Sequence, residues 1–477
     1  MWLAIRTNAA DWFFKVPGLF YGIMGSMKKN RRAVVVVAAL AGGLLAQHPL
    51  AAATSDLQAR IDACSASGGG VVLVGQGLYD NTAPLVLKDN VELRLEAGAV
   101  LRATTNREAY AYMPGWDRGA FITAIGATNI AITGEGRIEC SGDRVPSLVK
   151  GEPGRWRGIH LLRCRNVRLE RFSLSNSHSW CCYLQECDGV AVKGLYIVNH
   201  CNINNDGLDI ASRNVTVEDC DIDSEDDALV FKNHNPDFVV ENVTVRNCRL
   251  ASNTSFVKIG TETWGGFRNI CVSDCELDCR TFITKRNGYL NRPGVRTMNT
   301  GRDGLAVMVV DGGFAEDIRF SRIRMKRGIS VPVFIRLDRR HARADGKPTY
   351  LRNVTIEDVK MERPSTSYVA SSITGADGLR PSDITLRRMR LRPLACADAK
   401  MANAPVPDCI GKYPGGMMFG CALPANGFYL RHADRVSFKD VSIEPTGEDV
   451  RKPIFAEDSS PERAEEAVFG RVDHGKH

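Results

Sequence analysis

Three acidic residues in one short stretch have the types and spacing for acid and base chemistry. Asp206 begins the apolar run Asp206-Gly-Leu-Asp-Ile, and Asp227 begins a second run, Asp227-Ala-Leu-Val-Phe, directly after Asp226. A short strand predicted over 214–222 separates the two runs. If the runs are the same element in successive turns of a coil, Asp206 and Asp227 lie side by side, and three carboxylates share one patch of surface.

Such a cluster is costly, because like charges at short range oppose the ionisation of all three acids together. A structural protein has little reason to accept that repulsion unless a cation fills the gap. Hydrolysis of a glycosidic bond, in contrast, needs one carboxylic acid to protonate the leaving oxygen and one carboxylate to activate water. The spacing therefore favours a hydrolase. The nearby acids Asp209, Asp223 and Glu225 are predicted to be turn residues.

The elements that would position these acids belong to a repeat. A motif of Asn or Asp followed by apolar residues at alternate positions returns along the chain, for example as Asn166-Val-Arg-Leu, Asn214-Val-Thr-Val and Asn242-Val-Thr-Val. The steps from 166 to 189, 214, 242 and 269 are 23, 25, 28 and 27 residues. Each unit is rich in Val, Ile, Leu and Thr with a period of two, which predicts strands.

Units this short cannot bury their apolar faces alone, so they must stack. An all-β fold, a right-handed parallel β-helix of about ten coils, satisfies this requirement, because each strand pairs with its copy one coil away, at about 4.8 Å. The recurring Asn suits a bend between strands, since Asn tolerates left-handed backbone and its amide can form a ladder with its neighbours. A sandwich or propeller is the alternative, but it would not leave parallel identical positions.

The repeat also sets the predicted domain boundaries. Residues 55–64 are predicted to form a capping helix, with Leu57, Ile61 and Cys64 on one side, and 54–456 form the β-helix catalytic domain. Long steps between repeats place inserted loops at 286–304, which could wall a groove, and at 395–424, interpreted as a capping excursion. The charged segment 457–477 is predicted to be a surface helix or disordered.

Residues 1–53 are predicted to be an upstream segment and signal peptide. Four basic residues follow Met27, then an apolar run over 33–46 and small residues over 49–53, which is typical of a secretory signal. A membrane-anchored tail is the alternative, and translation starts at Met1, Met24 or Met27. Without residues 1–53, six Lys and Arg and one acid are lost, so the formal charge falls from +7 to +2.

A nearly neutral mature chain gives nucleic-acid binding little electrostatic support. We expect an exported monomer, periplasmic or extracellular, without stable membrane insertion after signal cleavage and without nucleic acid as a partner. Among the fifteen cysteines, Cys220, Cys248 and Cys275 each fall six residues after a repeat Asn and are predicted to be stacked interior thiols. Pairing among the remaining cysteines, including those at 181, 182, 187, 201, 396, 409 and 421, is left open.

The pattern Asn204-Asn205-Asp206-Gly207, followed by Asp226-Asp227 on these coils, resembles the polygalacturonases and related pectin hydrolases of glycoside hydrolase family 28. The resemblance covers residues 71–445. It implies cleavage of glycosidic bonds in galacturonic-acid-containing polysaccharides or oligosaccharides, with inversion at the anomeric carbon. In that reading Asp226 is the general acid, Asp206 and Asp227 hold the attacking water, and no metal or cofactor takes part.

Two family elements differ in this chain. The glycine-histidine-glycine element is expected one coil after the acids, where the sequence has Thr254-Ser255-Phe256. The arginine-isoleucine-lysine element is expected one coil later, at Ile283-Thr284-Lys285, so only its lysine is matched. Rhamnogalacturonan-cleaving members also lack the histidine, so strict polygalacturonase specificity does not follow.

Basic side chains near the acids are candidates for binding a sugar carboxylate. Lys258 and Lys285 are predicted at outward positions of the two coils below the acids, and with Arg286 they could bind a sugar carboxylate. An ordinary solvated face is the alternative for the lysines. Asn204 and Asn205 in the acidic motif are predicted to contact substrate.

Further substrate contacts are predicted on neighbouring turns. Glu262 and Trp264 could line the groove, Trp264 by stacking on a sugar or, alternatively, as a buried packing residue. His200, together with His178 and Trp180 one coil earlier, could contact substrate, with core or loop positions as the alternative.

Two other functions remain open. A β-helix polysaccharide lyase would use the acids to bind Ca²⁺ and a Lys or Arg as the base. A non-catalytic β-helix that binds a surface glycan would have its acids separated or salt-bridged, without a groove over them. The grouping of acids rather than aromatic residues on the candidate face favours an enzyme over the glycan-binding protein.

Overall fold

The computed structural model describes residues 4–6, 12–16, 19–22, 55–81, 83–110, 113–115, 119–145, 154–280, 301–341, 346–376 and 378–461. It divides into two compact units, Met1–His48 and Pro49–His477. In the first unit, strands β1 (Ala4–Arg6), β2 (Trp12–Val16) and β3 (Leu19–Gly22) pair antiparallel. The stretch that carries the predicted signal sequence, 27–53, lies outside the described residues.

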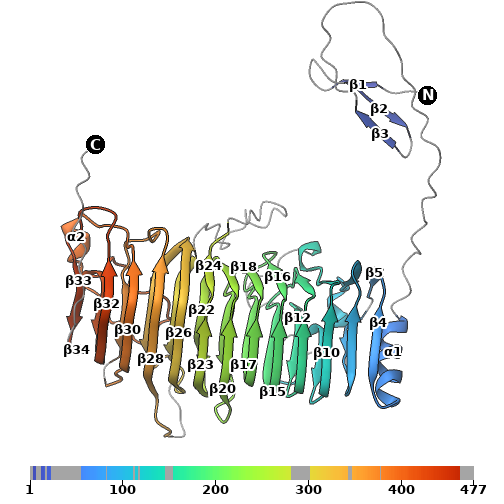
Figure 1. Cartoon of the computed structure of the whole chain (residues 1–477), viewed down its shortest axis with the longest axis horizontal. Helices are drawn as coiled ribbons and strands as arrows, with labels where there is room; N and C mark the ends of the chain where they lie inside the picture. Colours follow the sequence, from blue (N-terminus) through green and yellow to red (C-terminus); the bar gives the residue numbers. More distant parts are fainter. Residues whose placement is uncertain are drawn as a thin grey trace, which may run out of the picture. The chain divides into compact units, whose positions relative to one another are not determined.

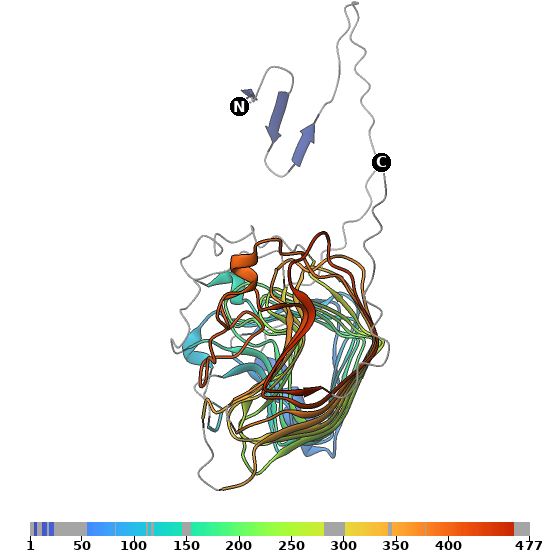
Figure 2. The same cartoon turned by 90° about the vertical axis from the view of Figure 1, so that its left-hand side faces the viewer.

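The second unit is a right-handed parallel β-helix, as the repeat predicted (Figure 1). Seen along the stack, its strands form three sheets around a common interior (Figure 2). The sheet whose strands β17 and β19 start just after Asp206 and Asp227 is named the site sheet. It contains β6 (Leu85–Val86), β9 (Ala120–Ile125), β12 (Arg157–Leu162), the first parts of β15 (Cys182–Lys193) and β17 (Leu208–Glu218), β19 (Leu229–Asn233), β22 (Ser255–Thr263), β25 (Gly301–Val309), β27 (Ile329–Leu337), β29 (Ser371–Gly375), β31 (Ala425–Arg431) and β33 (Lys452–Glu457).

The other two sheets continue each coil. The second contains β4 (Gly70–Val74), β7 (Val91–Leu95), β10 (Thr128–Gly134), β13 (Arg165–Glu170), the second parts of β15 and β17, β20 (Val239–Arg246), β23 (Gly266–Ser273), β26 (Phe314–Arg327), β28 (Tyr350–Met361), β30 (Ser382–Leu391), β32 (Asp434–Ile443) and β34 (Ser460–Pro461). The third contains β5 (Gly77–Asp80), β8 (Ala99–Arg102), β11 (Arg137–Glu139), β14 (Ser173–Ser175), β16 (Tyr196–Asn199), β18 (Asp221–Ser224), β21 (Arg249–Ser252), β24 (Glu276–Asp278) and the ends of β26, β28, β30 and β32. Each coil contributes one strand to the second sheet. The described residues therefore form more coils than the roughly ten that the repeat predicted.

The bends between the sheets use the recurring Asn in the predicted way. Asn129, Asn166 and Asn242 have positive φ angles of 56°, 51° and 56°, which Asn adopts more readily than most residues. Their amides form a ladder, since Asn166 donates to Asn129 at 2.7 Å and Asn242 donates to Asn214 at 3.0 Å. Each coil therefore turns at the same place, which keeps equivalent residues in register.

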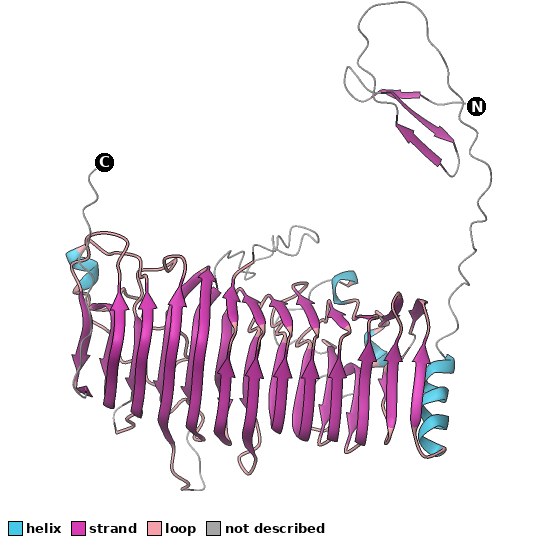
Figure 3. Cartoon of the chain, viewed as in Figure 1, coloured by secondary structure: helices cyan, strands magenta, loops and turns pink. Residues whose placement is uncertain are grey.

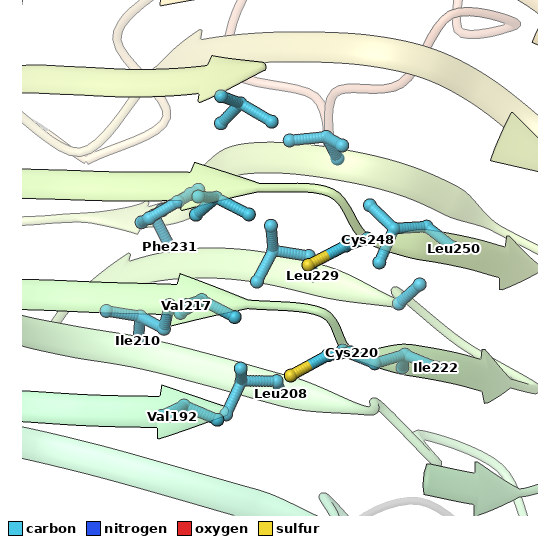
Figure 4. Close-up of a cluster of buried hydrophobic side chains, with 14 of the residues drawn as sticks. Val192, Leu208, Ile210, Val217, Cys220, Ile222, Leu229, Phe231, Cys248 and Leu250 are labelled. Carbon is cyan, nitrogen blue, oxygen red and sulfur yellow. The ribbon is translucent and has the colours of Figure 1, made fainter. Parts of the chain in front are cut away.

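The interior is filled by aliphatic side chains stacked in columns, with thiols among them (Figure 4). Cys220, Cys248 and Cys275 are all buried, as predicted for interior thiols. All fifteen cysteines are free, so the pairings left open by the sequence do not form in this structure. Hydrophobic burial along the stack, rather than cross-linking, therefore stabilises the coils.

Helix α1 (Ser55–Ala66) covers the first coil, as predicted, and extends two residues beyond the expected end (Figure 3). Leu57 and Ile61 are buried against the first strands. Gln58 exchanges two hydrogen bonds with the backbone of Val86, donating at 3.1 Å and accepting at 2.8 Å. The helix thus satisfies part of an open strand edge that would otherwise favour aggregation. None of the described helices is long and apolar enough to cross a membrane.

Two expectations about the later coils are wrong. Residues 395–424, named the C-terminal excursion and including α2 (Ala399–Ala402), do not cap the stack but pack on the outer face of the site sheet, with Phe419 and Leu423 against Val331 and Phe334. The predicted tail boundary at 456 also falls too early, because β34 still pairs with β32. The excursion packs on the site sheet because its apolar residues meet an apolar outer face on β25 and β27.

Candidate active site

The pairing of β17 with β19 brings the predicted acids together. Leu208 pairs with Leu229, and the amide of Gly207 donates to the carbonyl of Asp227 at 2.9 Å. Asp206 and Asp227 therefore occupy the same position in adjacent coils, as expected from the repeat. Asp226 lies in the bend just before β19, next to Asp227 in the chain.

A cavity of about 190 Å³ lies over these acids on the outer face of the site sheet. It is lined by Trp180, Asn204, Asp206, Asp226, Asp227, Lys232, Lys258, Thr261, Glu262 and Tyr413. The three acids thus lie outside the interior of the β-helix and face one common space.

Two lysines that lie almost completely inside the protein neutralise two of the acids. The ammonium of Lys232 lies 2.7 Å from a carboxylate oxygen of Asp206 and 2.7 Å from one of Asp209. The ammonium of Lys258 lies 2.8 Å from Asp227. The Lys232 ammonium is also 3.5 Å from the ring centroid of Trp180, a cation–π contact.

Burial and charge shift the pKa values of this cluster in opposite directions. Burial raises the pKa of Asp206 well above its usual range, and neighbouring carboxylates raise it further while Lys232 opposes them. Burial lowers the pKa of Lys232, but the carboxylates of Asp206 and Asp209 outweigh it, and the pKa lies well above its usual range. Burial also opposes ionisation of Glu262, but the nearby cations, Lys232 first, hold its pKa at about 2.

Asp226 has a different environment from the other two acids. Its Oδ2 accepts a hydrogen bond from Asn204 Nδ2 at 3.2 Å, and Asn204 in turn accepts one from Arg155 at 3.2 Å. The Ser252 hydroxyl donates to the Asp226 carbonyl at 2.6 Å, which fixes the bend. Asp226 is partly exposed, and among the described residues it forms no ion pair with a Lys or Arg.

The other predicted site residues fall into three groups. Asn204, Lys258 and Glu262 line the cavity, and Lys258 is 3% exposed, so it does not belong to a solvated face. Asn205 does not line the cavity, because its amide donates to the carbonyls of Ser177 and Ser179, both at 2.9 Å.

The remaining predicted residues lie away from the cavity lining or outside the described chain. His200 is buried and lies 2.7 Å from Asp223. Trp264 stacks on His341, with ring centroids 5.3 Å apart. Lys285 and Arg286 lie outside the described residues.

The position expected for the first of the two family elements, 254–256, lies one coil after the acids, as predicted. Val257 pairs with Leu229, so Ser255 stands directly below Asp227. The next strand is β25, where Asp303 pairs with Ser255. The next coil of the site sheet therefore continues at Asp303. Residues 283–285, where the second element was expected, lie outside the described residues.

Sequence reasoning named Lys258 as a sugar-binding candidate but not as the partner of Asp227, and it missed Lys232. Asp209, predicted as a turn residue, is a fully buried member of β17, and Asp223 belongs to β18. Lys232 stands at an outward position of β19, five residues after Asp227. The alternation of β19 was the available signal for Lys232, whereas Tyr413 comes from the C-terminal excursion and leaves no local signal.

Gly207 lets the two acid-bearing coils approach each other, so we predict that Gly207→Ala destabilises the protein. A Cβ there would lie 2.4 Å from the Ile222 side chain and 2.6 Å from the Ala228 carbonyl. Overpacking of this kind costs about 1–3 kcal/mol, measurable by urea denaturation. Gly75→Ala is the matched control, because its nearest neighbour is 3.5 Å away. Equal stability of both variants would contradict the prediction.

Sequence comparison relates this chain to glycosyl hydrolases of family 28 and to polygalacturonases. Residues 75–282 match the glycosyl hydrolases family 28. An endo-polygalacturonase of Pectobacterium parmentieri is 25% identical over 367 residues, which are 71% of this chain and 84% of that protein.

Two solved structures share the fold. A family 28 exopolygalacturonase of Yersinia enterocolitica has a TM-score of 0.60 at 18% identity, covering 88% of this chain and 75% of that one. An exopolygalacturonase of Thermotoga maritima has a TM-score of 0.55 at 21% identity, covering 71% and 83%.

Proposed function

From the membership of this chain in glycosyl hydrolases family 28, we propose that it is a pectin-degrading hydrolase that cleaves glycosidic bonds of galacturonic-acid-containing chains with inversion. The enzyme works as an exported monomer, periplasmic or extracellular. One observation carries the proposal: three carboxylates line one cavity, and lysines neutralise two of them.

The different surroundings of Asp206, Asp226 and Asp227 indicate which of them is the general acid and which activate water. A general acid must carry a proton before the reaction, and Asp226 is the one of the three acids without a cation partner among the described residues. Asp206 and Asp227 each lie beside an ammonium group. The Lys232 ammonium supports the carboxylate form of Asp206 against burial, which raises the pKa of this acid. Asp226 is therefore the acid, and Asp206 with Asp227 binds and activates water.

The reaction balances with these groups alone. Asp226 transfers its proton to the glycosidic oxygen while the bond between that oxygen and the anomeric carbon breaks. Water attacks the opposite side of the carbon and gives its proton to Asp206 or Asp227. Attack from the opposite side inverts the configuration, which NMR of the first-formed product would detect.

The ion pairs also bear on the two alternatives. Asp206 and Asp227 are salt-bridged, as a non-catalytic glycan-binding protein would allow, but they share one cavity rather than being separated. For a calcium-dependent lyase, both lysines would have to give way to the metal ion. The arrangement thus supports hydrolysis over calcium-assisted elimination.

A screen of polygalacturonate, rhamnogalacturonan and their oligomers with reducing-end detection tests the proposal. We expect new reducing ends from at least one galacturonic-acid-containing substrate, without an ultraviolet-absorbing unsaturated product. Appearance of that unsaturated product would establish elimination instead, and inactivity on every substrate would reject the enzyme proposal.

Activity is expected to fall on the acid side of the pH profile. Asp206 must be deprotonated to accept a proton from water, and its pKa is raised from the ordinary 3.8 by burial. As the pH falls through this raised value, Asp206 gains a proton and kcat/KM decreases. The midpoint of the decline should lie above pH 3.8 when kcat/KM is measured against pH. Full activity at that pH would contradict the role of Asp206.

A further inference from the structure

Tyr413 of the C-terminal excursion forms one end of the cavity. Thr261 donates a hydrogen bond to the Tyr413 hydroxyl at 3.1 Å. The Arg340 guanidinium carbon lies 5.5 Å from the ring centroid of Tyr413, and the Lys258 ammonium lies 5.8 Å from it. One hydrogen bond and two cations thus hold the ring beside β22.

Beyond Tyr413, protein fills the line along which a groove would continue. Below Asp227 this line runs through Ser255 to Asp303. The amide of Gly416 donates to Asp303 at 2.9 Å. A Cβ on Gly416 would lie 2.4 Å from the Asp303 carboxylate and 2.8 Å from Val331, so the excursion lies directly on the sheet here.

The cover over the following strands is a packed apolar cluster. Phe419 and Leu423 of the excursion contact a group that includes Met308, Val331 and Phe334, all fully buried. Contacts of this density leave no channel for a hydrated sugar. A sugar chain therefore cannot run from Asp227 along the outer face of β25 and β27.

The cavity also ends at the opposite side. Trp180 forms its edge, and the guanidinium carbon of Arg157 lies 4.7 Å from the Trp180 ring centroid. Arg157 and Tyr183, on the strands beyond, are fully buried. The cavity of about 190 Å³ is smaller than the roughly 300–1,000 Å³ of pockets for drug-sized ligands. It is suited to one sugar unit rather than several.

We propose that this site accepts only the end of a galacturonic-acid-containing chain, and that Tyr413 limits the number of sugar units that enter. The inference rests on the proposed function and adds which bond is broken, namely the terminal one. A chain cleaved in the middle needs an opening at both ends of the site. A chain end can enter beside the partly exposed Asp226 and Asn204 and stop against Tyr413.

Early products from oligogalacturonides of increasing length and from polygalacturonate test this proposal. The wild-type protein should release the monosaccharide as its sole early product from every substrate. Viscosity of the polymer should fall slowly relative to the reducing ends formed. A ladder of intermediate oligomers at early times would overturn the chain-end proposal, while a complete lack of hydrolysis would overturn it together with the proposed function.

Variants at Tyr413 test the second part. In Tyr413→Ala the end of the cavity retreats to Gly416, so disaccharide products absent from the wild-type reaction should appear. Tyr413→Phe keeps the ring and should keep the wild-type products. Tyr368→Ala is the control, because Tyr368 is similarly exposed, at 45% against 53% for Tyr413. Unchanged product size in Tyr413→Ala, with the melting temperature of each variant showing that it is folded, would overturn the role of Tyr413.

Discussion

Asp226→Asn should lower kcat by roughly 10²–10⁴-fold, the usual contribution of a general acid. Asn cannot supply a proton to the leaving oxygen, but its side-chain oxygen can still accept the hydrogen bond that Asn204 donates to Asp226 at 3.2 Å. Because Asp226 is partly exposed and forms no ion pair with a Lys or Arg within the described chain, the stability of the variant should change little. Steady-state kinetics on the substrate found in the screen would measure the effect.

The leaving group separates the role of Asp226 from that of Asp227. A galacturonide with an acidic phenol as leaving group needs little protonation, so Asp226→Asn should lose much less activity on it than on a sugar chain. Asp227→Asn should lose activity on both substrates, because water activation is needed in either case. Asp237→Asn, at an exposed carboxylate, is the control. Equal losses on the two substrates in Asp226→Asn would contradict its assignment as the acid.

Lys232→Met should lower the free energy of unfolding by about 3–5 kcal/mol, the typical result of removing one partner of a buried ion pair. Lys232 lies 2.7 Å from both Asp206 and Asp209, and all three side chains are at most 4% exposed. Met keeps the length and the apolar contact with Trp180 but leaves two carboxylates together without their cation. Chemical denaturation monitored by fluorescence would measure the loss.

Two further variants make this prediction specific. Adding Asp209→Asn to Lys232→Met removes one of the two unpaired negative charges, so it should restore part of the lost stability. Lys347→Met removes a cation from an exposed pair with Asp237 and should cost less than about 1 kcal/mol. A loss in Lys232→Met no larger than that in Lys347→Met would show that the buried network does not stabilise the site.

The repeat explains why the fold could be predicted in such detail. A recurring Asn followed by alternating apolar residues specifies a bend and a strand at each turn, and every coil contacts mainly its neighbours. Local patterns therefore determine most of the contacts in the stack. Registry between Asp206 and Asp227 followed from the same rule, since it needs only one coil and the next.

The burial and pairing of the charged side chains in the site could not be predicted from local sequence patterns. Alternation in β17 and β19 places Asp209 and Lys232 outward, but alternation alone does not say that both are buried and paired across coils. Burial arises from whatever covers the outer face. The step from Ser255 to its partner Asp303 in the next coil is likewise longer than the repeat, and a repeat pattern does not predict where the next strand begins after such a step.

By itself the sequence determined the parallel β-helix, the interior thiols and the stacking of the two acid-bearing coils, because these depend on contacts between neighbouring repeats. Only the tertiary structure decided which acids have lysine partners and where the cavity ends. Lys258 reaches Asp227 from the next coil, and Tyr413 reaches the cavity from a segment more than 150 residues away from Glu262 in the chain. The lysine pairs do join neighbouring coils, but a pattern of apolar residues does not say which charged side chains are buried and meet there. The position of Tyr413 follows no repeat at all, so no periodicity could predict it.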